Sequence, residues 1–127
     1  MTRTAADLTP QDLDLYRRTA RERVRQVREE AVLRRGKAMV LARRAAQMLR
    51  ERFGVTRVVV FGSLVREGCF TAWSDVDLAA WGLRPADTFR AIGITHGLDP
   101  DIEVNLVDMS ICAPSLAGVI EAEGREL

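Results

Sequence analysis

A chain of 127 residues, 47% of them hydrophobic, is long enough for one domain with its own core. It holds no run of about eighteen apolar residues and no secretory start, so we predict a cytoplasmic protein without membrane contact. Its two cysteines and single histidine lack metal-ligand spacing, which gives no basis for a zinc site.

The net charge of +1 conceals a basic first half and an acidic second half. Residues 1–57 carry fifteen Lys or Arg against seven Asp or Glu, whereas residues 58–127 carry four against eleven. Thr9 and Pro10 predict the start of a helix. A narrow apolar stripe follows at three- or four-residue steps, formed by Leu13, Tyr16, Ala20, Val24, Val27 and Ala31. It predicts an intrachain helical pair, a homodimer or a docked protein partner, with nucleic acid as a less favoured partner of the arginines.

A break in the helical pattern is predicted near Gly36, because glycine costs about 1 kcal/mol inside a helix. A second helix over residues 37–52 then directs one face to the core and ends at Gly54. The residues of that face are Val40 or Leu41, Ala45, Met48 and Leu49. We therefore divide the chain into a basic helical extension, residues 1–36, and a domain, residues 37–127.

The first predicted strand is the β-branched and aromatic run from Val55 to Phe61. It delivers Gly62 and Ser63 to its end, where the absence of a side chain on Gly62 would let a phosphate approach the backbone. A short helix or turn over residues 64–67 would offer free N–H groups to the same anion. Arg66 is a further candidate to neutralise phosphate charge.

The next strand, residues 75–81, begins with two acids at alternating positions. Asp75 and Asp77 therefore project from one face of the sheet, and they repel each other unless a cation lies between them. Mg²⁺ accepts such oxygen ligands and leaves room for substrate phosphates. Two Mg²⁺ ions could activate an attacking oxygen and stabilise a departing pyrophosphate.

A helix over residues 86–97 would cover the sheet with Phe89, Ile92 and Leu98. The strand after it, residues 101–107, has an apolar face of Ile102, Val104 and Leu106 and a polar face of Asp101, Glu103 and Asn105. Glu103 or Asp101 could approach the same metals, whereas Asn105 offers only a neutral carbonyl. A last helix follows Pro114, and the whole order predicts an α+β or α/β sandwich with a small mixed sheet and helices mainly on one face.

The chain from about Phe53 to Leu127 resembles the minimal nucleotidyltransferases of the polymerase-β-like superfamily. The shared pattern is a strand, Gly62-Ser63, a spacer, Asp75-x-Asp77 and a later strand. The resemblance implies that residues 37–127 form such a domain, with Gly62, Ser63 and Arg66 at the nucleotide. It places Asp75 and Asp77 at the metals. The family's third acid falls on Asn105, so either Glu103 is the third ligand and catalytic residue, or catalysis is weakened or lost.

By this resemblance the chain is expected to be an enzyme that transfers a nucleoside monophosphate, AMP being the expected group, from ATP or another NTP. Two Mg²⁺ ions would assist, and the acceptor would be a hydroxyl on a partner macromolecule. The resemblance suggests an all-helical HEPN-type toxin, modified on tyrosine, as that partner. Two alternatives stay open: an inactive or weakened binding module that acts as an antitoxin, and a nucleic-acid accessory protein led by the basic helix.

Overall fold

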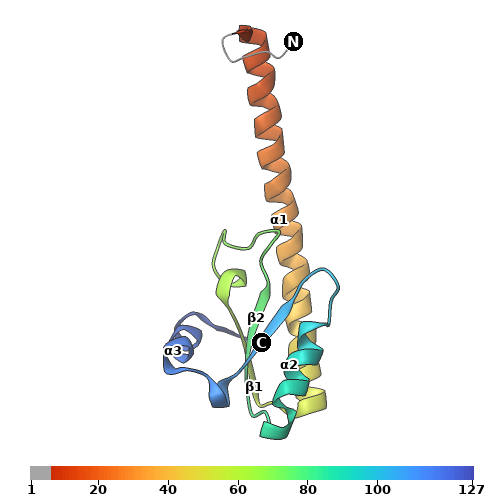
Figure 1. The fold of residues 1–127 in the computed structure, drawn as a ribbon, viewed down its shortest axis with the longest axis vertical. Coiled ribbons are helices and arrows are strands. Elements are labelled where there is room, and N and C mark those ends of the chain that lie inside the picture. Colours follow the sequence, from red (N-terminus) through yellow and green to blue (C-terminus); the bar gives the residue numbers. More distant parts are fainter. Residues whose placement is uncertain (1–6) are drawn as a thin grey trace.

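The structure, a computed structural model, describes residues 7–127 and consists of one long helix beside a small α+β domain (Figure 1). In chain order the elements are helix α1 (Pro10–Phe53), strands β1 (Arg57–Phe61) and β2 (Val76–Trp81), helix α2 (Thr88–His96), strand β3 (Val104–Asp108), helix α3 (Pro114–Glu123) and strand β4 (Arg125–Glu126). Single 3-10 turns occupy Gly62–Leu64, Pro85–Asp87 and Met109–Ile111. No helix within the described range is long and apolar enough to cross a bilayer.

The four strands form one mixed sheet in the order β3-β2-β1-β4. Strand β2 runs parallel to β3 and antiparallel to β1, which in turn is antiparallel to β4. Helices α1 and α2 cover one face and α3 covers the other, as Figure 1 shows. The predicted α+β class, with a small mixed sheet, helices mainly on one face and a long N-terminal helix, is confirmed.

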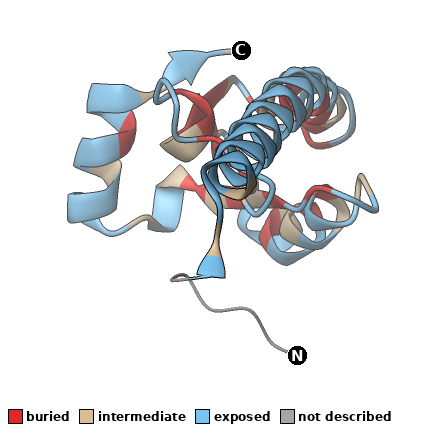
Figure 2. Cartoon of the chain, turned by 90° about the horizontal axis from the view of Figure 1, so that it is seen from above, coloured by how far each residue is buried: buried red, intermediate tan, exposed pale blue. Residues whose placement is uncertain are grey.

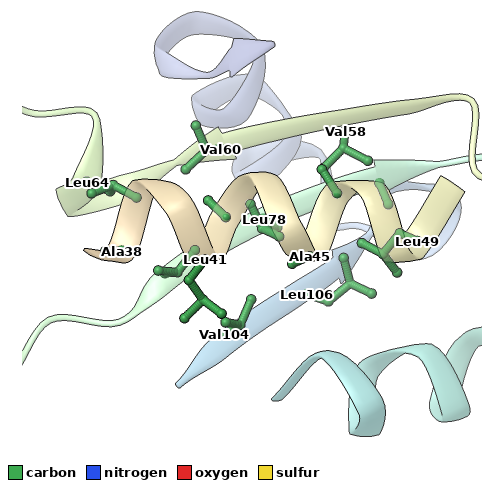
Figure 3. Close-up of a cluster of buried hydrophobic side chains, with 14 of the residues drawn as sticks. Ala38, Leu41, Ala45, Leu49, Val58, Val60, Leu64, Leu78, Val104 and Leu106 are labelled. Carbon is green, nitrogen blue, oxygen red and sulfur yellow. The ribbon is translucent and has the colours of Figure 1, made fainter. Parts of the chain in front are cut away.

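The main core lies between α1 and the sheet. Because strand side chains alternate, the even-numbered residues of β1, β2 and β3 face α1 and α2, and the odd-numbered ones face α3. Alanines on α1 allow a close approach to the sheet, and leucines fill the space between them, as Figure 3 shows. The central residues of this layer are Ala38, Leu41, Ala45 and Leu49 on α1 with Val58, Val60, Leu78, Val104 and Leu106 on the strands.

Helix α1 is continuous over 44 residues, so the predicted break near Gly36 is wrong. A capping box begins the helix, since Thr9 N–H donates to Asp12 Oδ2 at 3.0 Å and Asp12 N–H donates to Thr9 Oγ1 at 3.1 Å. Gly54, with φ of +66°, ends it. The cost of a single glycine, about 1 kcal/mol, is small beside the loss of the helical hydrogen bonds that a break would require.

The first half of α1 projects beyond the domain (Figure 1), and its residues are almost all exposed, as the pale blue ribbon in Figure 2 shows. Within the apolar stripe, Tyr16 is 70% exposed and Val27 is 65% exposed. This exposure and the unbroken helix rule out the intrachain helical pair. Burial begins at Ala38, one residue beyond the predicted boundary of the domain, and the division at residues 36 and 37 stays a prediction.

Three further details differ from the sequence prediction. Phe89 is 86% exposed and does not cover the sheet, because the 3-10 turn before α2 sets a phase in which Thr88, Ala91 and Thr95 point inward. Strand β3 begins at Val104, so residues 101–103 lie before it. The two-residue strand β4 was not predicted, because its pairing with β1 depends on residues far away in the chain.

Candidate active site

The Gly62 turn and Asp77 meet at one edge of the sheet. Strands β1 and β2 are antiparallel and Phe61 pairs with Asp77, so the turn that follows β1 lies beside the first residues of β2. Gly62 has φ of +76°, and a Cβ atom at this position would lie 2.5 Å from Asp77 Oδ2. Only glycine fits this conformation and this approach. The backbone of the turn and the carboxylate therefore line the same space.

Asp75 and Asp77 reach a common partner on the neighbouring strand. Asn105, the register partner of Asp77 on β3, donates from Nδ2 to Asp75 Oδ2 at 3.4 Å and to Asp77 Oδ1 at 3.3 Å. Both acids thus project from the same face of the sheet, the one that α3 covers. The amide lies at the position to which the resemblance assigns a third acid.

Ionisation of Asp77 is disfavoured in this setting. Burial raises the pKa of Asp77, the hydrogen bond from Asn105 opposes that rise, and the charge of Asp75 adds to it. A cation between the two carboxylates would remove the repulsion. The donor set suits a hard ion such as Mg²⁺, because it offers carboxylate oxygens and, after rotation of the Asn105 amide, a carbonyl oxygen.

Glu103 does not contact Asp75, Asp77 or Asn105. Its side chain is 62% exposed, and Oε1 lies 4.0 Å from His96 Nε2. Within residues 7–127, no cluster of three or more His, Cys, Asp or Glu side chains is arranged to hold a metal. The structure thus brings Asn105 to Asp75 and Asp77 and leaves Glu103 outside, so the role of Glu103 as third ligand and catalytic residue stays a prediction.

Of the other two nucleotide-site candidates, Ser63 lies in the turn after β1 and Arg66 follows that turn. Ser63 is half-buried in the 3-10 turn, which a hydrogen bond of 3.2 Å from Val65 N–H to Gly62 O closes. Arg66 donates from Nε at 3.3 Å and from Nη2 at 2.9 Å to Glu123 Oε2 on α3. This hydrogen bond raises the pKa of the Arg66 guanidinium. A phosphate would therefore have to share or displace Glu123 to engage Arg66, whose role at the nucleotide stays a prediction.

Asp108, at the end of β3, is a buried acid that sequence reasoning did not single out. It is 4% exposed and accepts hydrogen bonds from Thr88 Oγ1 at 2.8 Å and Ser110 Oγ at 2.7 Å. Burial acts to raise the pKa of Asp108, but the bonds from Ser110 and Thr88 together outweigh it and lower the pKa below its usual value. Asp108 therefore ties the start of α2 to β3 behind the site.

Sequence reasoning also missed two arginines of α1. Arg34 and Arg35 donate to backbone carbonyls in the segments that carry Asp75 and Gly62. Their partners lie 40 and 29 residues away in the chain, so no local pattern could reveal them.

The comparison with known protein families agrees with this geometry. The sequence profile described as the nucleotidyltransferase domain matches residues 42–118, more than half of the chain. The chain belongs to the nucleotidyltransferase domain family. The match spans β1, the Gly62 turn, β2 and β3, and it leaves out most of α1.

Solved structures share the fold of this nucleotidyltransferase-domain chain. A mutant form of the toxin–antitoxin MntA–HpeT matches with a TM-score of 0.55 and 21% identity, over 67% of this chain and 69% of that one. A toxin–antitoxin with AMP-PNP matches with a TM-score of 0.54 and 21% identity, over 64% and 67%. A tri-AMPylated Shewanella oneidensis HEPN toxin in complex with MNT antitoxin matches with a TM-score of 0.51 and 19% identity, over 70% of each chain.

At these identities the likeness concerns the fold, and the resemblance to minimal nucleotidyltransferases is confirmed at that level. No curated protein matches the chain.

Proposed function

We propose that this chain transfers a nucleoside monophosphate, AMP from ATP, to a hydroxyl on a partner protein. The observation that carries the proposal is the Gly62 turn against Asp77, with Asp75 held on the same Asn105 amide. Gly62 and Ser63 would bind the β- and γ-phosphates through backbone N–H groups. Asp75 and Asp77 would hold Mg²⁺, which when bound neutralises phosphate charge and stabilises the departing pyrophosphate.

In the proposed step the hydroxyl oxygen of the acceptor attacks the α-phosphorus. A new P–O bond forms there while the bond from the α-phosphorus to the bridging oxygen breaks. Pyrophosphate leaves with the bonding electrons, and the hydroxyl proton passes to solvent, or to Glu103 if that side chain moves toward the acceptor. The chain contributes positioning, because the turn would hold the phosphates and the two carboxylates would hold the positive charge that the phosphates require.

A second function is favoured by one observation, the amide at the third-acid position. Asn105 supplies no negative charge, so a site of Asp75, Asp77 and Asn105 binds a divalent cation less strongly than three carboxylates would. On this reading the chain is a weakened or inactive nucleotidyltransferase-fold module that acts by binding its partner.

The proposed partner is a helical protein of the HEPN type, with a tyrosine hydroxyl as acceptor. Two of the structurally similar proteins support this partner, because they were solved as toxin–antitoxin complexes: an MntA–HpeT pair and a tri-AMPylated HEPN toxin with its MNT antitoxin. The exposed stripe of α1, which includes Tyr16, Val24 and Val27, is the contact surface we propose for it. A homodimer through the same stripe is the competing outcome, which the molar mass of the isolated chain in solution would reveal.

Nucleotide binding and transfer are tested separately. Calorimetry with Mg²⁺ and a non-hydrolysable ATP analogue should show binding to the isolated wild-type chain and none to Asp77→Asn. Asp14→Asn, the same chemical change on an exposed carboxylate in the projecting half of α1, is the matched control and should bind normally. Transfer is then followed with α-labelled ATP and a co-expressed HEPN partner. Partner binding that survives Asp77→Asn, with no label transferred by the wild type, would favour the binding module.

The third-acid position is tested by a pair of substitutions. If Asn105 marks a weakened site, Asn105→Asp should raise the Mg²⁺-dependent rate of transfer, while Glu103→Gln should leave it unchanged. If Glu103 serves as the third ligand, Glu103→Gln should abolish transfer and Asn105→Asp should change little. The rates are compared at limiting and saturating Mg²⁺, because a change in metal affinity disappears at saturation.

A further inference from the structure

Two adjacent arginines on α1 reach the two backbone segments that carry the site. Arg34 donates from Nη2 to the carbonyl of Ser74, which immediately precedes Asp75, at 3.3 Å. The same nitrogen donates to the carbonyl of Asp101, in the segment before β3, at 3.3 Å. Arg35 donates from Nη2 at 3.3 Å to the carbonyl of Leu64, the last residue of the Gly62–Leu64 turn.

Their neighbouring positions explain why one helix can hold both halves of the site. Successive residues of an α-helix point about 100° apart, so Arg34 and Arg35 diverge around α1. Arg34 reaches the segments that precede β2 and β3, while Arg35 reaches the turn that follows β1. Nη2 of a guanidinium carries two N–H groups, so this one nitrogen can donate to two carbonyls at once, as it does in Arg34.

These contacts matter because the chain between β1 and β2 has little regular structure of its own. Residues 65–75 contain turns and bends, and local bonds order the second half: Ser74 N–H donates to Thr71 O at 3.2 Å, and Thr71 N–H donates to Ser74 Oγ at 2.9 Å. Arg125 adds a third arginine contact, donating from Nη2 to Val65 O at 3.3 Å. Local bonds thus order the segment itself, and arginines from α1 and β4 attach it to the rest of the domain.

The two arginines are not placed as stability alone would favour. The Nε atoms of Arg34 and Arg35 are buried without a hydrogen-bond partner within the described part of the chain, and such a group costs stability. A shorter apolar side chain would avoid this cost. The bonds from their Nη2 atoms to three backbone carbonyls offset this cost.

We propose that Arg34 and Arg35 are positioning residues that hold Asp75 and the Gly62 turn at the separation that metal and phosphate binding require. The inference rests on the proposed function for its catalytic consequence, but the tether itself can be measured without nucleotide. It also gives the second half of α1 a role beyond core packing, since neither arginine lies within the matched residues 42–118.

The tether is tested by hydrogen exchange at single amides, measured by NMR on the full chain. Arg34→Gln should speed exchange of the Ser74 amide by about tenfold or more and leave the Val65 amide nearly unchanged. Arg35→Gln should show the reverse, because Val65 N–H closes the turn whose last carbonyl Arg35 holds. Arg43→Gln, an exposed arginine on the same helix, is the matched control and should alter neither amide.

The catalytic consequence is read from the same variants. Affinity for Mg²⁺ and a non-hydrolysable ATP analogue should fall about tenfold in Arg34→Gln and Arg35→Gln, and kcat for transfer should fall by about 10- to 100-fold, since small displacements at a reacting site are costly. Arg35→Lys should recover much of the loss because it has one carbonyl to hold. Arg34→Lys should recover less, because its shorter side chain must reach the carbonyls of two separate segments at once.

The outcomes separate the tether from the proposed function. Exchange at Ser74 and Val65 that matches Arg43→Gln would overturn the positioning role. A uniform rise across β1 and β2 would overturn it too, since it would indicate general destabilisation. If the wild type binds no nucleotide, the proposed function fails while the exchange pattern still decides the tether. The lysine variants supply the answer if a glutamine variant does not fold.

Discussion

Replacing Gly62 with alanine should damage the site far more than the fold. A residue with a Cβ atom loses about 1–2 kcal/mol in the left-handed conformation that Gly62 adopts. The new Cβ would also lie 2.5 Å from Asp77 Oδ2. To restore an ordinary contact of about 3.5 Å the carboxylate must move by about 1 Å. A displacement of that size at a reacting group costs about a hundredfold in rate.

Gly68 provides the matched control. Its φ is +71°, close to the +76° of Gly62, but a Cβ atom there meets no atom within 4 Å. Gly68→Ala and Gly62→Ala should therefore both lose about 1–2 kcal/mol in urea unfolding. For a chain of this size that loss lowers Tm by roughly 3–8 °C. Only Gly62→Ala should lose Mg²⁺-dependent binding of a non-hydrolysable ATP analogue in calorimetry.

A single result would refute this reasoning. If Gly62→Ala binds the analogue with the affinity of Gly68→Ala, the approach of Gly62 to Asp77 is not what forms the site. The unfolding curves guard against a trivial explanation, because equal losses of stability in the two variants leave only the local contact to differ.

Further predictions concern pH and the long helix. Because burial raises the pKa of Asp77, ionisation of this side chain disfavours the folded state, and the wild type loses stability as pH rises through that pKa. The gain in free energy of unfolding from Asp77→Asn should therefore be larger at about pH 7 than at about pH 4 in urea unfolding. An equal gain at the two pH values would contradict this. For Asp108 the pH dependence of stability is reversed, since hydrogen bonds from Ser110 and Thr88 outweigh burial and lower its pKa. Asp108→Asn should cost about 1–3 kcal/mol of folding free energy at pH 7, and this loss should shrink as pH falls below about 4. A loss that stays constant with pH would refute the linkage. Gly36→Ala should raise the free energy of unfolding by about 0.5–1 kcal/mol, because Gly36 lies inside a helix with open space around it, and no gain in Tm would count against a continuous α1.

The parts of the fold that depend on near neighbours could be predicted from the sequence. The run before Gly62 and the alternation after Asp75 identify β1 and β2, because each strand has a period of two that its own residues display. The same alternation places both acids on one face. Gly54 marks the end of α1 because a helix commonly ends at a glycine in the left-handed conformation.

The parts that depend on distant contacts could not be predicted. Gly36 shows a local preference for a break, but helical hydrogen bonds on both sides carry α1 through it. Glu103 and Asn105 share a face by alternation, yet only Asn105 lies inside β3, and Glu103 turns toward His96. The bond from Arg34 to the Ser74 carbonyl joins residues 40 positions apart, a separation that no periodicity records.

Because α1 is unbroken, the number of residues between the exposed stripe and the domain sets the direction in which the stripe faces. With no hinge at Gly36, residues 10–36 and the domain share one helical phase. Adding or deleting one residue in that stretch would rotate Tyr16 and Val24 by about 100° around the helix relative to Asp75, and shift them by about 1.5 Å. An insertion of two full turns, about seven residues, would return these side chains to their original direction around the helix axis but farther from the domain. Homologous extensions that meet the same surface should therefore differ in length by whole turns.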